Sequence, residues 1–186
     1  MEQSLRERNK QIAMEVVRKS ARKLMREHGF EGVTVEQIAS ASNVSPSTVY
    51  RHFGTKEALV LSSDRPTQLV ERLQNDSSKR SSVDAFTRAV IKIWDGDVSA
   101  QFERSLIMSN PSLLEAWERQ LLDQRADIAD AFAQRRGAKS TGLKDQSTAA
   151  ASLAVLITVL RSQHERGDDA KPLARQLDKA FAALRE

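Results

Sequence analysis

Cysteine is absent from this sequence of 186 residues. Its absence excludes disulfide bonds and thiolate metal sites, as is typical of proteins that work in a reducing cytosol. Glycine and proline are scarce, with seven and four residues, and aromatic residues make up only 5%. No alternating apolar run exceeds a few residues, so strand signals are few. The sequence therefore predicts an all-α protein.

Long hydrophobic runs are also missing. The longest runs from Ala149 to Leu160 and is interrupted by Ser152 and Thr158, so it is shorter than the roughly 20 residues that cross a bilayer. The N-terminus is charged and lacks the apolar core of a signal peptide. We therefore expect a cytoplasmic protein that does not contact a membrane.

Catalytic motifs are a third absence. The three histidines, His28, His52 and His164, are scattered over different predicted helices. No zinc-protease histidine pair, nucleophile elbow or glycine-rich phosphate loop occurs. We expect no catalytic residue, no metal and no cofactor.

The net charge of +4 is unevenly placed. The first 60 residues hold ten Lys and Arg against seven Asp and Glu, which gives this third +3 of the total. A basic N-terminal third favours a nucleic-acid partner without establishing one.

The segment from Thr34 to Lys56 is the most informative part of the sequence. Thr34 and Gln37 fit a capping box that starts a helix. Asn43 stands where the chain must turn through positive φ. Ser45 then caps a second helix with Pro46 at its first position, and Gly54 ends it. This pattern predicts a helix-turn-helix, with Thr55 capping a further helix.

The second of these helices carries polar side chains where a core helix would carry leucines. Val49 and Phe53 supply the inward side. The residues left outside are Pro46, Ser47, Thr48, Tyr50, Arg51 and His52. A capped helix with this face is typical of a helix that enters the major groove of DNA.

Residues 12–60 resemble the DNA-binding domain of the TetR family of bacterial transcriptional regulators. The resemblance is carried by Gly29-Phe30, by Thr34 to Ala39, by Ser45 to Phe53 and by Lys56 to Leu59. Asn43 departs from the family, which usually has glycine there. The resemblance implies a DNA-binding domain over residues 1–54 and a helical ligand-binding and dimerisation domain over residues 55–186.

The resemblance also implies roles for single residues. The residues expected to contact the phosphates or sugars of DNA are Thr34, Thr48, Tyr50, His52 and Lys56. Pro46, Ser47 and Arg51 would lie nearest the base edges, with Arg51 equally suited to a phosphate. Ser45 is expected to cap its helix first and to contact DNA second.

The C-terminal two thirds predict further helices after a polar loop that ends near residue 82. One predicted helix begins near Val83, and a shorter one includes Phe102. A long one is predicted from Pro111 to Arg136. In the family, such helices enclose a ligand cavity. The bulky candidates for its lining are Phe86, Trp94, Phe102, Met108 and Trp117. The alternative is that these residues form an ordinary core around no ligand.

The last two helices, at about residues 147–165 and 171–185, suggest a partner subunit. The stretch from Ala149 to Leu160 is apolar nearly all round, so it must be buried on more than one side. The family dimerises through a four-helix bundle made of these two helices from each chain. The alternative is a monomer with this helix at its centre.

The function implied is that of a regulator which binds a near-palindromic operator as a homodimer, with an unidentified small-molecule inducer. Repression relieved by ligand is the commoner case in the family, which also has activators. The rival hypothesis is a helical protein-interaction module or a non-specific architectural DNA-binding module. An exposed face of hydroxyls, Tyr50 and Arg51 argues against simple protein docking, where apolar anchors are expected.

Overall fold

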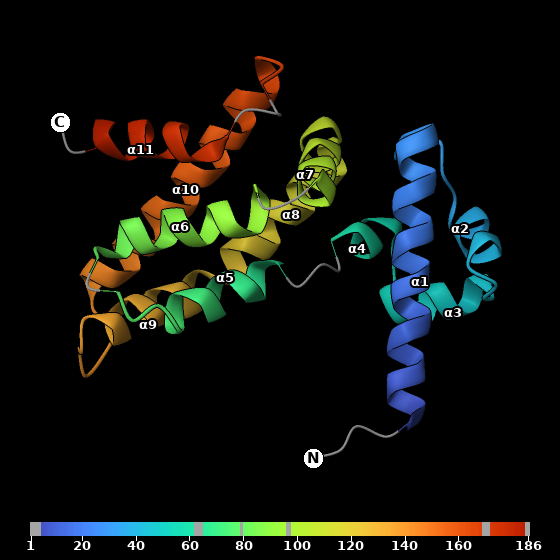
Figure 1. The fold of residues 1–186 in the computed structure, drawn as a ribbon, viewed down its shortest axis with the longest axis horizontal. Coiled ribbons are helices and arrows are strands. Elements are labelled where there is room, and N and C mark those ends of the chain that lie inside the picture. Colours follow the sequence, from blue (N-terminus) through green and yellow to red (C-terminus); the bar gives the residue numbers. More distant parts are fainter. Residues whose placement is uncertain (1–4, 62–64, 79, 96–97, 169–171, 185–186) are drawn as a thin grey trace. The chain divides into compact units, whose positions relative to one another are not determined.

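The computed structural model describes residues 5–61, 65–78, 80–95, 98–168 and 172–184. All regular structure in these ranges is helical, which confirms the all-α prediction. The chain divides into two compact units, Met1–Ser63 and Asp64–Glu186. In Figure 1 the first unit runs from blue to teal and the second from green to red.

The first unit contains four helices. They are α1 (Leu5–His28), α2 (Val35–Ala41), α3 (Pro46–Phe53) and α4 (Lys56–Val60). Gly29 ends α1 with a φ of +74° and donates its N–H to the carbonyl of Met25. The core is small and apolar, with Val17, Ile38 and Ala39 fully buried. Ala39 leaves room for α3 to cross α2 closely, as a helix-turn-helix requires.

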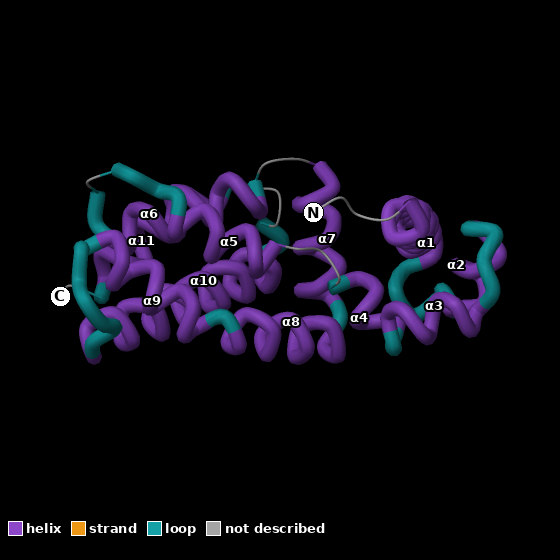
Figure 2. The backbone as a smooth tube through the Cα atoms, turned by 90° about the horizontal axis from the view of Figure 1, so that it is seen from below, coloured by secondary structure: helices purple, strands orange, loops and turns teal. Residues whose placement is uncertain are grey.

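The second unit contains seven helices among the described residues. They are α5 (Arg65–Gln74), α6 (Ser82–Trp94), α7 (Val98–Ser109), α8 (Pro111–Asp123), α9 (Arg125–Arg135), α10 (Leu143–Glu165) and α11 (Leu173–Ala183). The central helix is α10, which packs mainly against α9 and α11 and also contacts α6, α7 and α8. Figure 2 shows these helices and their connecting loops along the tube.

Two parts of the second unit differ from the sequence-based expectation. Helix α5 was not predicted, because Pro66 signals a loop; here Pro66 is the second residue of the helix, where proline removes no helical hydrogen bond. The long helix expected from Pro111 to Arg136 is two helices that meet at Gln124. The N–H of Gln124 donates to the carbonyls of Leu121 and Leu122 instead of continuing the regular ladder. Apolar spacing does not reveal this break, because Leu121 and Ile128 are both fully buried.

The domain boundary expected at residues 54 and 55 stays a prediction. Helix α4 groups with the first unit. Leu59 of α4 is buried, and α4 contacts both α1 and α3. Within the described residues, no helix is long and apolar enough to cross a membrane.

Candidate nucleic-acid interface

The turn between α2 and α3 is built by Asn43, with a φ of 54°. Asn43 is the single non-glycine residue with positive φ among those described. Next to it, the N–H of Val44 donates to the carbonyl of Ala39 at 3.0 Å, and the Ser42 hydroxyl donates to the carbonyl of Ile38 at 2.7 Å. Asparagine tolerates the left-handed conformation better than most residues. The predicted turn is confirmed, and these bonds set the angle at which α3 leaves α2.

Both predicted helix starts are confirmed. The Thr34 hydroxyl accepts the N–H of Gln37 at 3.2 Å, and the Gln37 side chain accepts the N–H of Thr34 at 2.8 Å. At the start of α3, the Ser45 hydroxyl oxygen accepts the N–H of Thr48 at 3.2 Å. Each cap satisfies backbone N–H groups that have no partner inside the helix.

The cap of α3 is also the centre of a hydroxyl cluster. The Ser45 oxygen lies 2.9 Å from the Ser47 hydroxyl oxygen and 2.8 Å from that of Thr48. All three hydroxyls stand at the N-terminal end of α3, where backbone N–H groups and the helix dipole favour anions. The cluster therefore has the donors that a phosphate oxygen requires.

The outer face of α3 is wet and polar. Val49 is buried with 1% of its surface exposed, whereas Tyr50 is 48% exposed. The other exposed side chains of the predicted face are Pro46, Ser47, Arg51 and His52, together with the caps Thr34 and Ser45. Thr48 is half-buried. The structure thus places eight of the nine predicted contact residues on the solvent side of α2 and α3.

Helix α1 adds positive charge beside this face. The Arg18 guanidinium lies 5.5 Å from the centre of the Phe53 ring, and the His52 ring meets the same ring edge-on at 4.6 Å. Partial burial lowers the pKa of His52 below its ordinary value, and the charges of Lys10 and Arg18 lower it further. The neutral form of His52 is therefore favoured in the free protein.

Lys56, the ninth predicted residue, lies at the start of α4, and its ammonium group is hydrogen-bonded to backbone carbonyls. Its Nζ donates to the carbonyl oxygens of Phe30 at 2.9 Å and Val33 at 3.2 Å. The side chain is 19% exposed, and Nζ is 3.9 Å from a carboxylate oxygen of Glu31. The ammonium group is thus held by the loop after α1. The phosphate contact expected of Lys56 from the resemblance stays a prediction.

The five bulky residues predicted to line a ligand cavity are mostly core residues. Phe86, Trp94, Met108 and Trp117 are buried, and Phe102 is half-buried. The Trp94 and Trp117 rings pack edge to face, with centres 6.5 Å apart. None of the five lines the three cavities that are described below or lie beside α10 and α11. The ligand role of the five residues stays a prediction.

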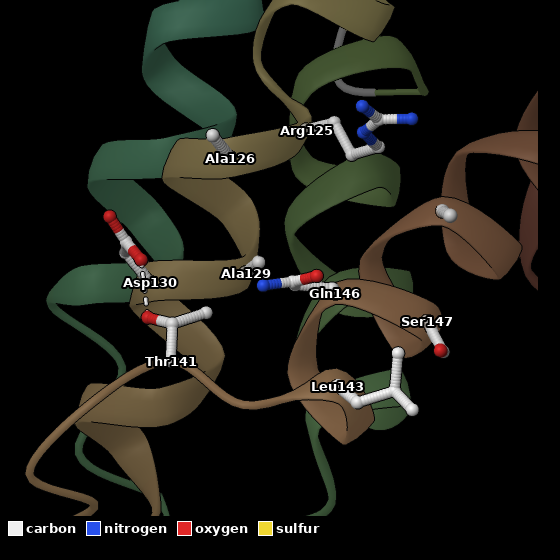
Figure 3. Close-up of a pocket in the computed structure, with 9 residues that line it drawn as sticks. Arg125, Ala126, Ala129, Asp130, Thr141, Leu143, Gln146 and Ser147 are labelled. Carbon is white, nitrogen blue, oxygen red and sulfur yellow. Dashed lines mark hydrogen bonds between the residues drawn. The ribbon is translucent and has the colours of Figure 1, made fainter.

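The largest of these three cavities, of about 460 Å³, lies between α9 and the start of α10. Figure 3 shows Gln146 of α10 beside Ala129 of α9, with the Thr141 hydroxyl bonded to Asp130. Sequence reasoning missed this cavity, because its polar residues lie on two helices that no motif links. Among the described residues, no group of three or more His, Asp and Glu side chains is placed to hold a metal ion.

A capped recognition helix, a positive-φ turn and an outward face of hydroxyls and cations define a helix-turn-helix DNA-binding regulator. Residues 17–62 match the family described as bacterial regulatory proteins, tetR family, and residues 80–186 match the MftR C-terminal domain family. The chain belongs to the TetR family of bacterial regulatory proteins, which confirms the resemblance seen in its sequence.

Two named relatives are similar over most of the chain. The mycofactocin biosynthesis transcriptional regulator MftR of Mycobacterium tuberculosis is 28% identical over 160 residues, which cover 83% of this chain and 80% of the relative. The regulator TcmR of Streptomyces glaucescens is 25% identical over 198 residues, covering 97% and 86%. Both relatives are transcriptional regulators.

Solved structures share the fold. The repressor FadR of Thermus thermophilus, in complex with lauroyl-CoA, superposes with a TM-score of 0.64 at 19% identity, covering 93% of each chain. The repressor SmeT of Stenotrophomonas maltophilia gives a TM-score of 0.61 at 19% identity, covering 91% of this chain and 89% of that one. At this identity the likeness concerns the fold alone.

Proposed function

We propose that this protein is a cytoplasmic, sequence-specific repressor that binds a near-palindromic operator as a homodimer and is released by a small molecule. The observation that carries the proposal is the outer face of α3, where Ser47, Thr48, Tyr50 and Arg51 surround one buried anchor, Val49. Hydroxyls and the Tyr50 phenol hold phosphates, and Arg51 reads base edges or a phosphate.

The dimer is supported by α10. Ala149, Leu153, Leu156 and Leu160 are buried inside the unit, yet the opposite face of the same helix is uncovered at Ala151, Ala154 and Thr158. Small side chains let a second helix approach closely. We propose that residues of about 147–165 and 171–185 pair with the same segments of a second copy. A dimer would hold two α3 helices one DNA turn apart, roughly 34–36 Å.

The proposed release by a small molecule is supported by two solved structures of similar fold that contain a small molecule. FadR of Thermus thermophilus binds lauroyl-CoA, and SmeT has been seen with triclosan. We propose that the second unit of this chain also binds a small molecule, near Phe102 and the other bulky residues named above. Such a ligand can shift DNA affinity only as far as it favours one conformation over the other.

Selection of bound genomic fragments by the purified protein tests the proposed DNA binding. We expect enriched fragments to share an inverted repeat whose half-sites are centred about 10 base pairs apart or a multiple of that. Fluorescence anisotropy on that repeat and on a scrambled duplex then measures specificity at one stated salt concentration. Equal affinity for both duplexes would favour the architectural alternative and overturn the proposal.

A further inference from the structure

A basic cavity of about 300 Å³ lies at the end of the second unit where the loop before α6 meets the end of α9 and the start of α10. Its lining residues are Arg80, Ser81, Ser82, Val83, Arg135, Arg136, Lys144, Asp145 and Thr148. Four of these carry positive charge and one carries negative charge. None of them belongs to the DNA-binding face or to the predicted ligand residues.

Arg135 is fixed in the wall of this cavity. Its side chain is only 5% exposed. One Nη donates to the carbonyl of Asp76, and the other donates to the carbonyls of Ser78 and Arg80 at 3.2 and 3.3 Å. Its Nε–H is buried and has no acceptor among the described residues. The guanidinium therefore shapes the loop into α6, and its one unbonded N–H is enclosed by the protein.

Arg136 is fixed by a carboxylate. Its Nε and one Nη donate to the two oxygens of Asp145 at 2.9 and 2.6 Å. The N–H of Gly142 donates to the same carboxylate at 3.1 Å. Asp145 is 2% exposed, and its oxygens are occupied by these donors. Arg136 has five N–H groups and keeps its others for a further acceptor.

The charged side chains that remain around this hollow are mostly positive. Asp76 offsets part of the charge of Arg135, since an Asp76 oxygen lies 3.4 Å from Nη1, but Asp76 does not line the cavity. Lys144 and Arg80 are exposed at the rim. The Ser81 hydroxyl oxygen accepts the N–H of Asp84, which leaves its proton for another acceptor. The N–H groups of Arg136 that Asp145 does not bind, together with the nearby Arg80, Lys144 and Ser81, are suited to phosphate oxygens.

We propose that this cavity binds a small molecule through a phosphate or diphosphate group. The bonds to Asp145 hold the Arg136 guanidinium in place at this hollow, and rigid donors bind with a smaller loss of entropy. A DNA duplex is a second conceivable source of phosphate, but a pocket of this size takes an end group more readily than a helical backbone.

Isothermal titration calorimetry of the full chain with inorganic pyrophosphate, at constant ionic strength set with sodium chloride and without DNA, tests the site. We expect saturable binding of one pyrophosphate per chain. Arg80→Gln and Lys144→Gln should each weaken it roughly fivefold to tenfold. The matched control Lys92→Gln, at an exposed position near the other end of α6, should change it less than about twofold.

Several results would overturn the proposal. One is the absence of saturable binding, and another is equal weakening in the Lys92→Gln control. Citrate that binds as tightly as pyrophosphate would assign the cavity to polycarboxylates instead. Loss of affinity for a random duplex in Lys144→Gln, matching the loss for pyrophosphate, would assign the surface to nucleic acid. The titrations with pyrophosphate and citrate contain no DNA, and the random duplex contains no operator, so none of these results depends on operator recognition.

Discussion

The ammonium group of Lys56 lies 2.9 Å from the carbonyl oxygen of Phe30 and 4.1 Å from the centre of the ring of the same residue. One side chain thus ties the start of α4 to the loop after α1 by a hydrogen bond and a cation–π contact. The Val33 carbonyl is a second acceptor at 3.2 Å. This lysine therefore joins the first helix of the first unit, α1, to its last helix, α4.

Replacing Lys56 by methionine should lower the free energy of unfolding of the first unit by about 2 kcal/mol. The reason is that the carbonyls of Phe30 and Val33 lose their charged donor. Urea unfolding followed by circular dichroism measures the change. Arg51→Gln, an exposed substitution on α3, should stay within about 0.5 kcal/mol of wild type. Equal stability of Lys56→Met and wild type would show that the amine is not a structural group.

Removal of single hydroxyls from α3 should weaken operator binding and preserve the fold. Thr48→Val and Tyr50→Phe each lose one donor to a phosphate, and hydrogen bonds to charged groups are worth about 1.5 kcal/mol or more, or roughly tenfold in affinity. Anisotropy on the selected operator measures affinity, and the unfolding midpoint checks the fold. If both variants bind the operator as wild type does, this face of α3 is not the one that contacts DNA.

Operator affinity should rise as the pH falls from 8 to 6, through His52. Partial burial, Lys10 and Arg18 lower the pKa of His52 in the free protein, so proton uptake needs a nearby anion. A phosphate next to the ring would favour the protonated form and raise its pKa. Protonation and DNA binding would then support each other. His52→Gln should flatten the profile, and a wild-type profile that is already flat would contradict the contact.

The second unit should lose stability in acid because of Asp76 and Asp145. Burial alone would raise the pKa of Asp76, but hydrogen bonds from Ser78 and Arg88 and the charge of Arg135 lower it well below its usual range. Hydrogen bonds from Arg136 lower the pKa of Asp145. Both carboxyls therefore contribute stability that is complete above their unfolded pKa of about 3.9 and is lost as the pH falls through the depressed values.

Urea midpoints measured between pH 7 and pH 2 check this pH dependence. Asp145→Asn should lower the midpoint at pH 7 and reduce its fall in acid. Asp127→Asn, at an exposed position in the first turn of α9, serves as the control and should keep the wild-type profile. An Asp145→Asn profile parallel to that of wild type would show that the pair with Arg136 has no part in acid unfolding.

A bulky charge on the uncovered face of α10 should break the proposed dimer. Ala154→Arg places a guanidinium where two helices are expected to meet, and an unpaired buried charge is strongly unfavourable. Sedimentation at micromolar concentration should show a monomer, with weaker operator binding. Ser112→Arg, at an exposed position on α8, should leave the dimer intact. A monomeric wild-type protein at that concentration would refute the dimer itself.

The sequence was most informative where the structure depends on near neighbours. The caps at Thr34 and Ser45 and the turn at Asn43 involve residues at most five positions apart, so their spacing is visible in the chain. The role of Lys56 was not visible, because its carbonyl partners lie 23 and 26 residues upstream. The basic cavity escaped prediction for the same reason, since Arg135 holds carbonyls 55 to 59 residues away.

The hydroxyl cluster of Ser45, Ser47 and Thr48 has a kinetic consequence. In the free protein these groups serve as hydrogen-bond partners to one another. Redirecting an O–H donor from a neighbouring hydroxyl oxygen to a phosphate oxygen requires only rotation about a carbon–oxygen bond, with α3 itself unmoved. Contacts of this kind form and release quickly. They suit a protein that must sample many wrong stretches of DNA before it stops at one.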